Sequence, residues 1–313
     1  MKKIAIIGGA GFIGYNLTVF FADKGYSVKV ISRGVSADKF IIKNVETTVL
    51  NANDTAACID YIQDCETVIW LVTASIPSTN SDTLIDDFKF NVDPIIRFLE
   101  EAKKTSVKRF IYLSSGGTIY GDSKDRTLLD ESSPKNPISG YGLAKIISEK
   151  YIRFLTNNSS LQSFILRPSN VYGTHQNLVK PQGIIGFAFK AVLQEASIDL
   201  YNDGTVTRDF IYVTDLASAV LKCIESDYRE GHTSIYNVGS EKGYTIKEIL
   251  KKIDTVSKGN IVTINKSARS FDCNYNVLSS KKIEKDLNWR PDVSIEEGLK
   301  KVWEWIKNDA NER

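Results

Sequence analysis

The sequence predicts an α/β fold: a doubly wound parallel sheet with a second, smaller lobe formed by the C-terminal part of the chain. Apolar runs such as KIAII, VIWLV and RFIYLSS alternate with helical patterns through the first half. Continuous apolar runs in that order are typical of parallel strands buried on both faces. After Arg167-Pro168 glycine and proline become more frequent and the alternation stops, which favours a separate lobe.

The elements follow one another as strand, helix, strand. The expected strands are Lys3–Ile7, Ser27–Ile31, Thr47–Leu50, Thr67–Leu71, Arg109–Ser114 and Ser163–Arg167. The expected helices between them are Phe12–Lys24, Thr55–Gln63, Pro94–Thr105 and Gly140–Leu155. Regular alternation returns at Ala217–Ile224, and a helical tail over Lys281–Lys307 is interrupted at Trp289-Arg290-Pro291, because proline cannot continue a helix.

This order divides the chain into two parts. Residues 1–168, with about 205–238, are expected to form the sheet domain, and residues 169–204 and 239–313 the lobe that binds substrate. Ligands of a doubly wound sheet bind beyond the carboxyl ends of its strands. The site is therefore expected at that edge.

Composition excludes several classes of protein. The chain has 313 residues, 42% of them hydrophobic, and its 40 Lys and Arg against 38 Asp and Glu leave a net charge of +2. We therefore expect no nucleic-acid partner and no anionic membrane surface. No apolar stretch approaches the ~18 residues of a membrane span. Four scattered cysteines without a C-x-x-C pair and two histidines favour buried, reduced thiols, no metal site and a cytoplasmic protein.

A glycine loop follows the first strand. Residues 8–14 read GGAGFIG, which places Gly8, Gly11 and Gly14 around Phe12 and Ile13 at a strand-to-helix junction. Glycine there lets a pyrophosphate approach the amides at the helix N-terminus. In this βαβ context the loop predicts a Rossmann dinucleotide site.

The second strand lacks the acidic residue that usually binds the adenosine ribose. It ends in Ser32-Arg33 instead. Because a guanidinium pairs well with phosphate, this pair leaves both NAD and NADP open as cofactors.

Tyr141 and Lys145 lie four residues apart in the helix that begins SGYGLAK. Positions i and i+4 share a helix face, so both side chains can reach one cleft. A tyrosine is a poor base near neutral pH, with a pKa of about 10. A nearby lysine cation and an oxidised nicotinamide are expected to lower that pKa, so that Tyr141 can remove the proton of a hydroxyl as hydride leaves.

Several motifs together resemble an extended short-chain dehydrogenase/reductase, most similar to UDP-hexose 4-epimerases. They are GGAGFIG at 8–14, FNVDP around Asn91, LSSGGTIYGD at 113–122, Tyr141 with Lys145, LRPSNVYG at 166–173, VTRDFIYVTDLA at 206–217 and LNWRP at 287–291. The resemblance covers nearly the whole chain.

The resemblance implies roles for further residues. Tyr141 would be the acid/base, and Lys145 would lower its pKa and hold the nicotinamide ribose of NAD. The other cofactor contacts would come from the glycine loop, Ser32, Arg33, Leu71, Asn91, Ser114 and Pro168. The nucleotide sugar would contact Ser75, Thr118, Asn170, Tyr201, Arg208, Arg269, Asp272 and Tyr275.

The sequence departs from the family at two positions. The hydroxyl residue that normally completes the catalytic site is replaced by Gly116, so Thr118, or Ser115, is expected to supply that hydroxyl. Ser75 stands where these epimerases often carry a lysine. The residue that admits or excludes an N-acetyl group is Tyr275 or Asn276, depending on the register chosen.

The function expected from these features is an NAD-dependent 4-epimerase, an isomerase of carbohydrate metabolism such as polysaccharide biosynthesis. It would act on UDP-glucose and UDP-galactose or their N-acetylated forms through a 4-keto intermediate. The alternatives are an NADPH-dependent 4-keto-sugar reductase and a dinucleotide-binding regulator without catalysis. The resemblance also implies a homodimer built through the helices 94–105 and 140–155.

Overall fold

The computed structural model describes residues 2–34, 40–73, 84–178, 182–267 and 273–311. The chain divides into two compact units. Unit 1 comprises Met1–Ile119, Pro137–Arg167 and Ala217–Tyr236. Unit 2 comprises Tyr120–Asn136, Pro168–Leu216 and Asn237–Arg313.

Unit 1 is a doubly wound α/β sheet, as predicted. Seven strands form it in the order β10-β6-β5-β4-β1-β2-β3, and the pairs from β6 to β3 are parallel. The strands are β1 (Lys3–Ile7), β2 (Ser27–Ser32), β3 (Val45–Val49), β4 (Thr67–Trp70), β5 (Arg109–Leu113), β6 (Gln162–Pro168) and β10 (Thr233–Val238). The six strands expected from the sequence are all present close to their predicted ends.

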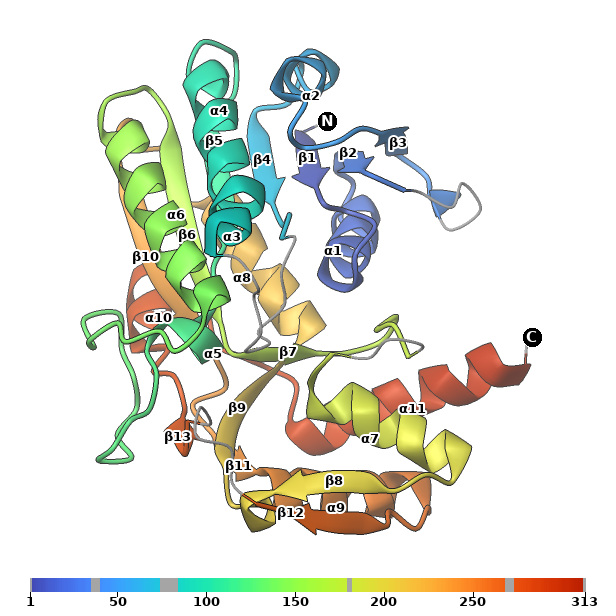
Figure 1. The fold of residues 1–313 in the computed structure, drawn as a ribbon. Helices are drawn as coiled ribbons and strands as arrows, with labels where there is room; N and C mark the ends of the chain where they lie inside the picture. Colours follow the sequence, from blue (N-terminus) through green and yellow to red (C-terminus); the bar gives the residue numbers. More distant parts are fainter. Residues whose placement is uncertain (1, 35–39, 74–83, 179–181, 268–272, 312–313) are drawn as a thin grey trace. The chain divides into compact units, whose positions relative to one another are not determined.

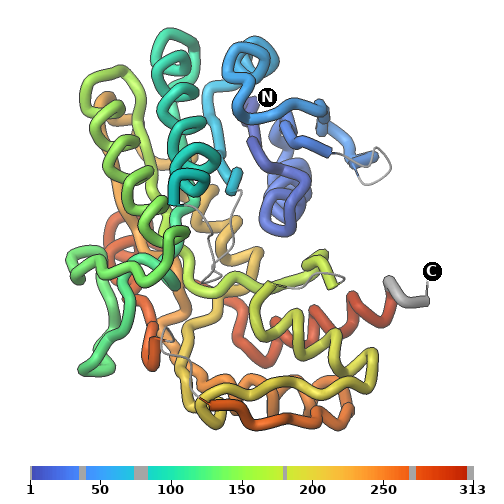
Figure 2. Tube along the Cα trace, in the orientation of Figure 1, coloured from blue at the N-terminus to red at the C-terminus, as the bar shows by residue number. Residues whose placement is uncertain are grey.

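Helices cover this sheet. They are α1 (Phe12–Asp23), α2 (Thr55–Tyr61), α3 (Leu84–Asn91), α4 (Asp93–Ala102), α5 (Gly116–Ile119), α6 (Gly140–Asn157) and α8 (Val213–Glu225). Figures 1 and 2 show α3 and α4 following one another alongside α6, and both pack against α6. The predicted helices are confirmed, whereas α3 was not expected.

One apolar core joins the sheet to α2, α4 and α6. Trp70 of β4 lies 5.1 Å from Phe98 of α4 and 6.2 Å from Phe110 of β5, measured between ring centroids. Ala5 and Ile7 of β1 belong to this core. Because side chains alternate along a strand, Ile4 and Ile6 face the opposite side of the sheet, and α1 packs against β1 and β2.

Unit 2 contains two small sheets. The strands are β7 (Asn170–Tyr172), β8 (Ile198–Tyr201), β9 (Thr207–Tyr212), β11 (Gly243–Thr245), β12 (Thr263–Lys266) and β13 (Tyr275–Asn276). The helices are α7 (Gly183–Gln194), α9 (Ile246–Ser257), α10 (Lys281–Leu287) and α11 (Ile295–Asn311), with a 3-10 turn at Asn202–Gly204. Strand β9 pairs with β7, β11 and β13, and β8 pairs with β12.

The boundary between the units differs from the predicted one. Residues 205–216 were assigned to the sheet domain, but β9 pairs within unit 2. Residues 120–136 also belong to unit 2, because the backbone of Ser123 and Leu129 hydrogen-bonds Tyr275 and Val277. These pairings are long-range, so sequence continuity could not predict them.

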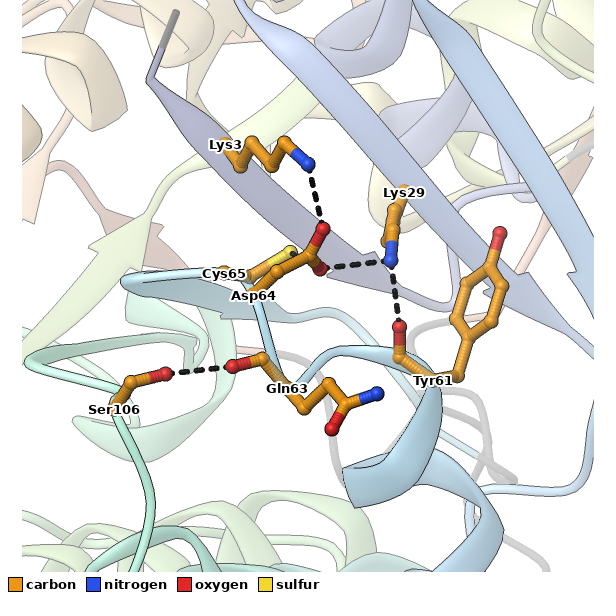
Figure 3. Close-up of polar contacts among 7 residues, drawn as sticks. All are labelled: Lys3, Lys29, Tyr61, Gln63, Asp64, Cys65 and Ser106. Atoms are coloured by element: carbon orange, nitrogen blue, oxygen red, sulfur yellow. Dashed lines mark hydrogen bonds and ion pairs between the residues drawn. The ribbon is translucent and has the colours of Figure 1, made fainter.

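A polar cluster lies at the amino-terminal edge of the sheet, opposite the edge where ligands are expected (Figure 3). The carboxylate of Asp64 accepts hydrogen bonds from Lys3 Nζ at 2.6 Å and from Lys29 Nζ at 2.7 Å. Lys29 Nζ also donates to the carbonyl oxygen of Tyr61 at 2.9 Å. The cluster joins β1, β2 and the end of α2, and it holds the pKa of Asp64 down at about 2.

The four cysteines are buried thiols outside any disulfide, as expected for structural cysteines. Burial raises the pKa of Cys58 to about 11 and that of Cys65 to about 12, so neither is a thiolate near neutral pH. Within the ranges that the structure describes, every helix is too short or too polar to span a lipid bilayer.

Candidate active site

The glycine loop joins β1 to α1 at the carboxyl edge of the sheet. Gly8 has a φ of +91°, and a Cβ there would lie 3.1 Å from the amide nitrogen of Val72. A Cβ on Gly14 would lie 2.5 Å from Gly9 Cα. Gly11 precedes α1 and has no side chain to cap the helix. The first-turn amides, including those of Phe12 and Ile13, are therefore open to an anionic group such as a diphosphate.

Other predicted cofactor residues lie at the same edge. Ser32 ends β2, and Arg33 follows it with an exposed side chain. Leu71 follows β4, and its backbone meets Gly8. Asn91 at the end of α3 is buried, donates from Nδ2 to the carbonyl oxygen of Asp87 at 3.0 Å and accepts from Thr73.

Helix α6 carries the predicted acid/base pair. Ser139 caps it by accepting a hydrogen bond from the Gly142 amide at 3.2 Å. The helix buries a polar stripe that includes Lys145, Ser148 and Glu149. Charged groups are seldom fully buried unless they are paired, so this stripe marks a candidate functional face of the helix.

Lys145 lies beside Tyr141 under the end of β5. Its Nζ donates to the carbonyl oxygen of Leu113 at 2.8 Å. The same atom lies 5.5 Å from the ring centroid of Tyr141 and 4.8 Å from that of Tyr112. The structure thus brings the two predicted residues together at the carboxyl edge of the sheet.

Burial dominates the electrostatics of both side chains. Burial raises the pKa of Tyr141 to about 12, although a hydrogen bond with Ser115 opposes this. Burial also lowers the pKa of Lys145 to about 7, against the attraction of Glu149. The expectation that Lys145 and an oxidised nicotinamide together lower the pKa of Tyr141 remains a prediction, because it concerns the cofactor-loaded site.

The third hydroxyl has two candidates in the structure. Gly116 begins α5, so the usual hydroxyl is absent from that position. Ser115 hydrogen-bonds Tyr141. Thr118 Oγ1 is buried and has no hydrogen-bond partner among the described residues. A Cβ on Gly142 would lie 2.8 Å from the carbonyl oxygen of Thr118, so glycine lets α5 approach α6 closely.

Sequence reasoning missed a buried ion pair behind this site. Glu149 Oε2 accepts from Arg167 Nη2 at 2.6 Å, and both side chains are almost fully buried. Ser114, which was predicted to contact the cofactor, donates its hydroxyl to Glu149 Oε1 at 2.5 Å. The signal was present, because Glu149 continues the i, i+4 spacing of Tyr141 and Lys145.

The predicted substrate residues of unit 2 are found on its larger sheet and on β8. Asn170 of β7 donates from Nδ2 to the carbonyl oxygen of Asp209 at 2.8 Å. Arg208 Nη1 donates to the carbonyl oxygen of Cys273 at 2.6 Å. Tyr275 is partly buried opposite Thr207, and Tyr201 ends β8. Pro168 ends β6 at the start of this unit, whereas Ser75, Arg269 and Asp272 lie outside the described residues.

Asp209 fixes the register of these residues. It is fully buried and accepts hydrogen bonds from the amide and hydroxyl of Ser240 at 2.9 and 2.6 Å. Its other oxygen accepts from the amide of Leu278 at 3.3 Å. Desolvation raises the pKa of Asp209 to about 6. The carboxylate therefore joins β9 to the segments on both sides of it.

A glycine loop and a Tyr-Lys pair at one sheet edge, with the lysine buried, define an enzyme of the extended short-chain dehydrogenase/reductase class. The model of the NAD dependent epimerase/dehydratase family matches residues 4–239. The chain belongs to this family, whose cofactor is NAD. The glycine loop fits such a cofactor, because a side chain at Gly14 would meet the backbone of Gly8 and Gly9 and push the helix N-terminus away from the loop.

Relatives are similar over the whole chain. A putative UDP-glucose 4-epimerase of Methanocaldococcus jannaschii is 30% identical over 309 residues, which cover 98% of this chain and 99% of the relative. A dTDP-4-dehydro-6-deoxyglucose reductase of Escherichia coli is 28% identical, with 97% of each chain covered. The crystal structure of a UDP-glucose 4-epimerase of Thermotoga maritima with UDP-glucose superposes with a TM-score of 0.90 at 28% identity, covering 98% and 99% of the two chains.

Proposed function

We propose that the chain is a nucleotide-sugar 4-epimerase that acts on UDP-hexoses through a 4-keto sugar. The observation that carries this proposal is the pair of Tyr141 and the buried Lys145, side by side at the edge that also holds the glycine loop. The likeness to the archaeal and Thermotoga epimerases over whole chains supports the choice of reaction. Scattered buried thiols favour the cytoplasm as its location.

Each group at the edge has a task in this mechanism. The amides that follow Gly11 would hold the diphosphate of NAD, and Lys145 has donors to spare for the nicotinamide ribose. Bound NAD would supply reversible hydride transfer at C4 of the sugar. Tyr141 removes the proton of the C4 hydroxyl and gives it back, so it acts first as base and then as acid.

Lys145 and a hydroxyl assist Tyr141. The ammonium favours the phenolate, which burial disfavours. The hydroxyl of Thr118 is the group we assign to the oxygen at C4, because that buried hydroxyl has no partner among the described residues. In unit 2, Arg208 and Asn170 would bind the nucleotide diphosphate.

Direct assay tests this function. Purified protein is incubated with UDP-glucose, UDP-galactose and their N-acetylated counterparts without added cofactor, and the products are separated by chromatography. Interconversion is expected, because the net redox change is zero. Tyr141→Phe should abolish it, whereas Tyr151→Phe, on an exposed part of the same helix, should not. Full activity in the Tyr141 variant would refute the mechanism.

A second function is favoured by Arg33. This exposed guanidinium follows β2, where it suits a 2′-phosphate, and Arg33 makes no ion pair among the described residues. The similarity to the Escherichia coli reductase points the same way. An NADPH-dependent reductase would consume NADPH with a nucleotide 4-keto sugar and would not interconvert UDP-hexoses.

We also propose that the protein is a homodimer. Large apolar side chains are exposed on α3 and α6, namely Leu84, Ile85, Phe88, Phe90, Leu143, Tyr151 and Phe154. Helix α4, which was expected to take part in the dimer, buries Ile95, Phe98 and Leu99 in the core. An exposed apolar patch of this kind marks a protein interface. The proposed contact therefore uses α3 and α6.

A further inference from the structure

We propose that Glu149 is a positioning residue that supplies the negative charge next to Lys145 and holds the end of β5 against α6. The inference rests on the acid/base role proposed above for Tyr141 and Lys145. It concerns a carboxylate that touches neither reacting group, so its effect must pass through Lys145 and Ser114.

The first observation is the placement of Glu149. Tyr141, Lys145 and Glu149 follow one another at intervals of four residues on α6, so they line one face of the helix. Lys145 and Glu149 are 4% and 5% exposed. Two opposite charges this deeply buried interact strongly, because little water screens them.

The second observation is how the carboxylate is held. Arg167 donates two hydrogen bonds to the Glu149 carboxylate, from Nε to Oε1 at 3.0 Å and from Nη2 to Oε2 at 2.6 Å. Ser114 donates to Oε1 as well. This bidentate geometry fixes the carboxylate in one orientation. Arg167 lies near the end of β6 and Ser114 directly after β5, so two neighbouring strands hold the anion.

The third observation connects that anion to the lysine. Residues 112–114 contact, in sequence, the two buried charged side chains of α6. The Tyr112 ring faces Lys145 Nζ, the Leu113 carbonyl oxygen accepts from it, and Ser114 bonds Glu149. Movement of Glu149 would therefore displace the carbonyl group that orients the ammonium.

Few other ionisable groups face Lys145. Helix α6 contributes Tyr141 and Glu149, β5 contributes Tyr112, and β6 contributes Arg167 behind the carboxylate. Helix α3, which packs against α6, carries the buried Asp87, whose Oδ1 lies 3.5 Å from Asn91 Nδ2. Glu149 opposes the effect of burial on Lys145 and raises its pKa. Arg167, as a cation, acts in the other direction.

Two single variants separate a charge effect from a structural one. Glu149→Gln removes the anion and leaves Arg167, so Lys145 loses its proton at lower pH. The alkaline limb of the profile of kcat against pH should move to lower pH by roughly one pH unit, and kcat at neutral pH should fall roughly tenfold with KM little changed. Arg167→Met removes the cation and leaves the anion, so the alkaline limb should move to higher pH.

A spectroscopic readout does not depend on the sugar. Ionisation of Tyr141 is followed by ultraviolet difference titration of the NAD-loaded protein, with the Tyr141→Phe protein as reference. The pKa of Tyr141 should be higher in Glu149→Gln than in the unmodified protein. If the unmodified enzyme turned over no nucleotide sugar, the proposed function would fail, while this titration would still decide the role of Glu149.

A double variant serves as the control for misfolding. Glu149→Gln with Arg167→Gln keeps a hydrogen-bonded side-chain pair without charge, and near-ultraviolet circular dichroism reports its packing. Its alkaline limb should lie between those of Glu149→Gln and the unmodified protein. Shifts of the same sign in both single variants, or no shift in either, would overturn the proposal and leave the ion pair a structural feature only.

Discussion

At the scale of single residues, burial opposes the charged forms of the two proposed acid/base residues. Tyr141 and Lys145 each have a pKa moved by desolvation toward the neutral form. A phenolate and an ammonium side by side stabilise each other, so the pair is reactive only as a pair. A Y-x-x-x-K pattern alone is therefore weak evidence in a sequence. The same two residues lying side by side, with the lysine buried, are stronger evidence in a structure.

Thr118 is the residue whose role is easiest to test. Thr118→Val keeps the shape of the side chain and removes a buried hydroxyl that has no partner among the described residues. The free energy of unfolding should therefore stay equal or rise slightly, because an unsatisfied polar group is removed. Epimerisation should nevertheless slow by roughly 100-fold, since the lost donor is one that stabilises developing charge.

Ser115→Ala is the matched variant for this experiment, because Ser115 hydrogen-bonds Tyr141. We expect it to reduce kcat less than Thr118→Val does. Rates are compared by product analysis and unfolding by urea titration. If Thr118→Val were fully active and Ser115→Ala were inactive, the third catalytic hydroxyl would be that of Ser115.

Part of the site could be read from residue spacing and part could not. Gly8, Gly14, Tyr141 and Lys145 are local patterns within one turn or one helix face. The contact of Glu149 with Arg167 joins α6 to β6 across a sheet edge. The spacing of four residues predicts that Glu149 lies on the same helix face as Lys145. The cation that pairs with Glu149 could be found only from the structure, because it depends on the parallel pairing of β5 and β6.

At the scale of elements, the buried strands of the main sheet were predicted well, whereas none of the short strands of unit 2 was expected. A buried parallel strand is a continuous apolar run, and that signal is local. Helix α3 combines apolar side chains with Asp86, Asp87 and Lys89, so it carries no clear core-facing stripe. The segment 120–136 has few regular elements, and its place is set by pairing with residues 275–278.

The cluster of Figure 3 makes a prediction at this scale. Lys29 and Lys3 hold the pKa of Asp64 at about 2, below its unfolded value of about 4. A depressed pKa of a carboxyl stabilises the folded state above the unfolded pKa, and this stabilisation is lost as pH falls from about 4 toward 2. Asp64→Asn should therefore lower the free energy of unfolding at pH 7, by no more than about 1 kcal/mol because the side chain is partly exposed.

Urea unfolding at several pH values measures this difference. It should shrink toward zero near pH 2, where Asp64 is half protonated in the folded protein as well. Asp60→Asn is the control, because Asp60 is exposed on α2 and makes no ion pair among the described residues. A difference for Asp64→Asn that stays constant across this pH range would show that its effect is not electrostatic.

At the scale of the whole molecule, the exposed apolar side chains of α3 and α6 call for a partner. Ile85 and Phe154 are 66% and 65% exposed on helices that pack together. A second copy of the chain would bury them by forming a two-fold contact in which the same helices meet. Light scattering after size-exclusion chromatography should therefore give the mass of two chains.

Charge in this patch should separate the two chains. Ile85→Glu with Phe154→Glu places carboxylates where apolar side chains would meet, and burying unpaired charge is costly. We expect a monomer in this variant at micromolar concentration. Ile41→Glu is the matched control, since Ile41 is 85% exposed elsewhere in unit 1 and should leave the dimer intact. Tyr141, Lys145 and Glu149 all belong to unit 1 of one chain. The monomeric variant should therefore keep the pH dependence of Tyr141 ionisation, even if it is less stable. If the unmodified chain were monomeric, the proposed dimer would be wrong. If the dimer persisted in the double variant, the subunit contact would lie elsewhere on the chain.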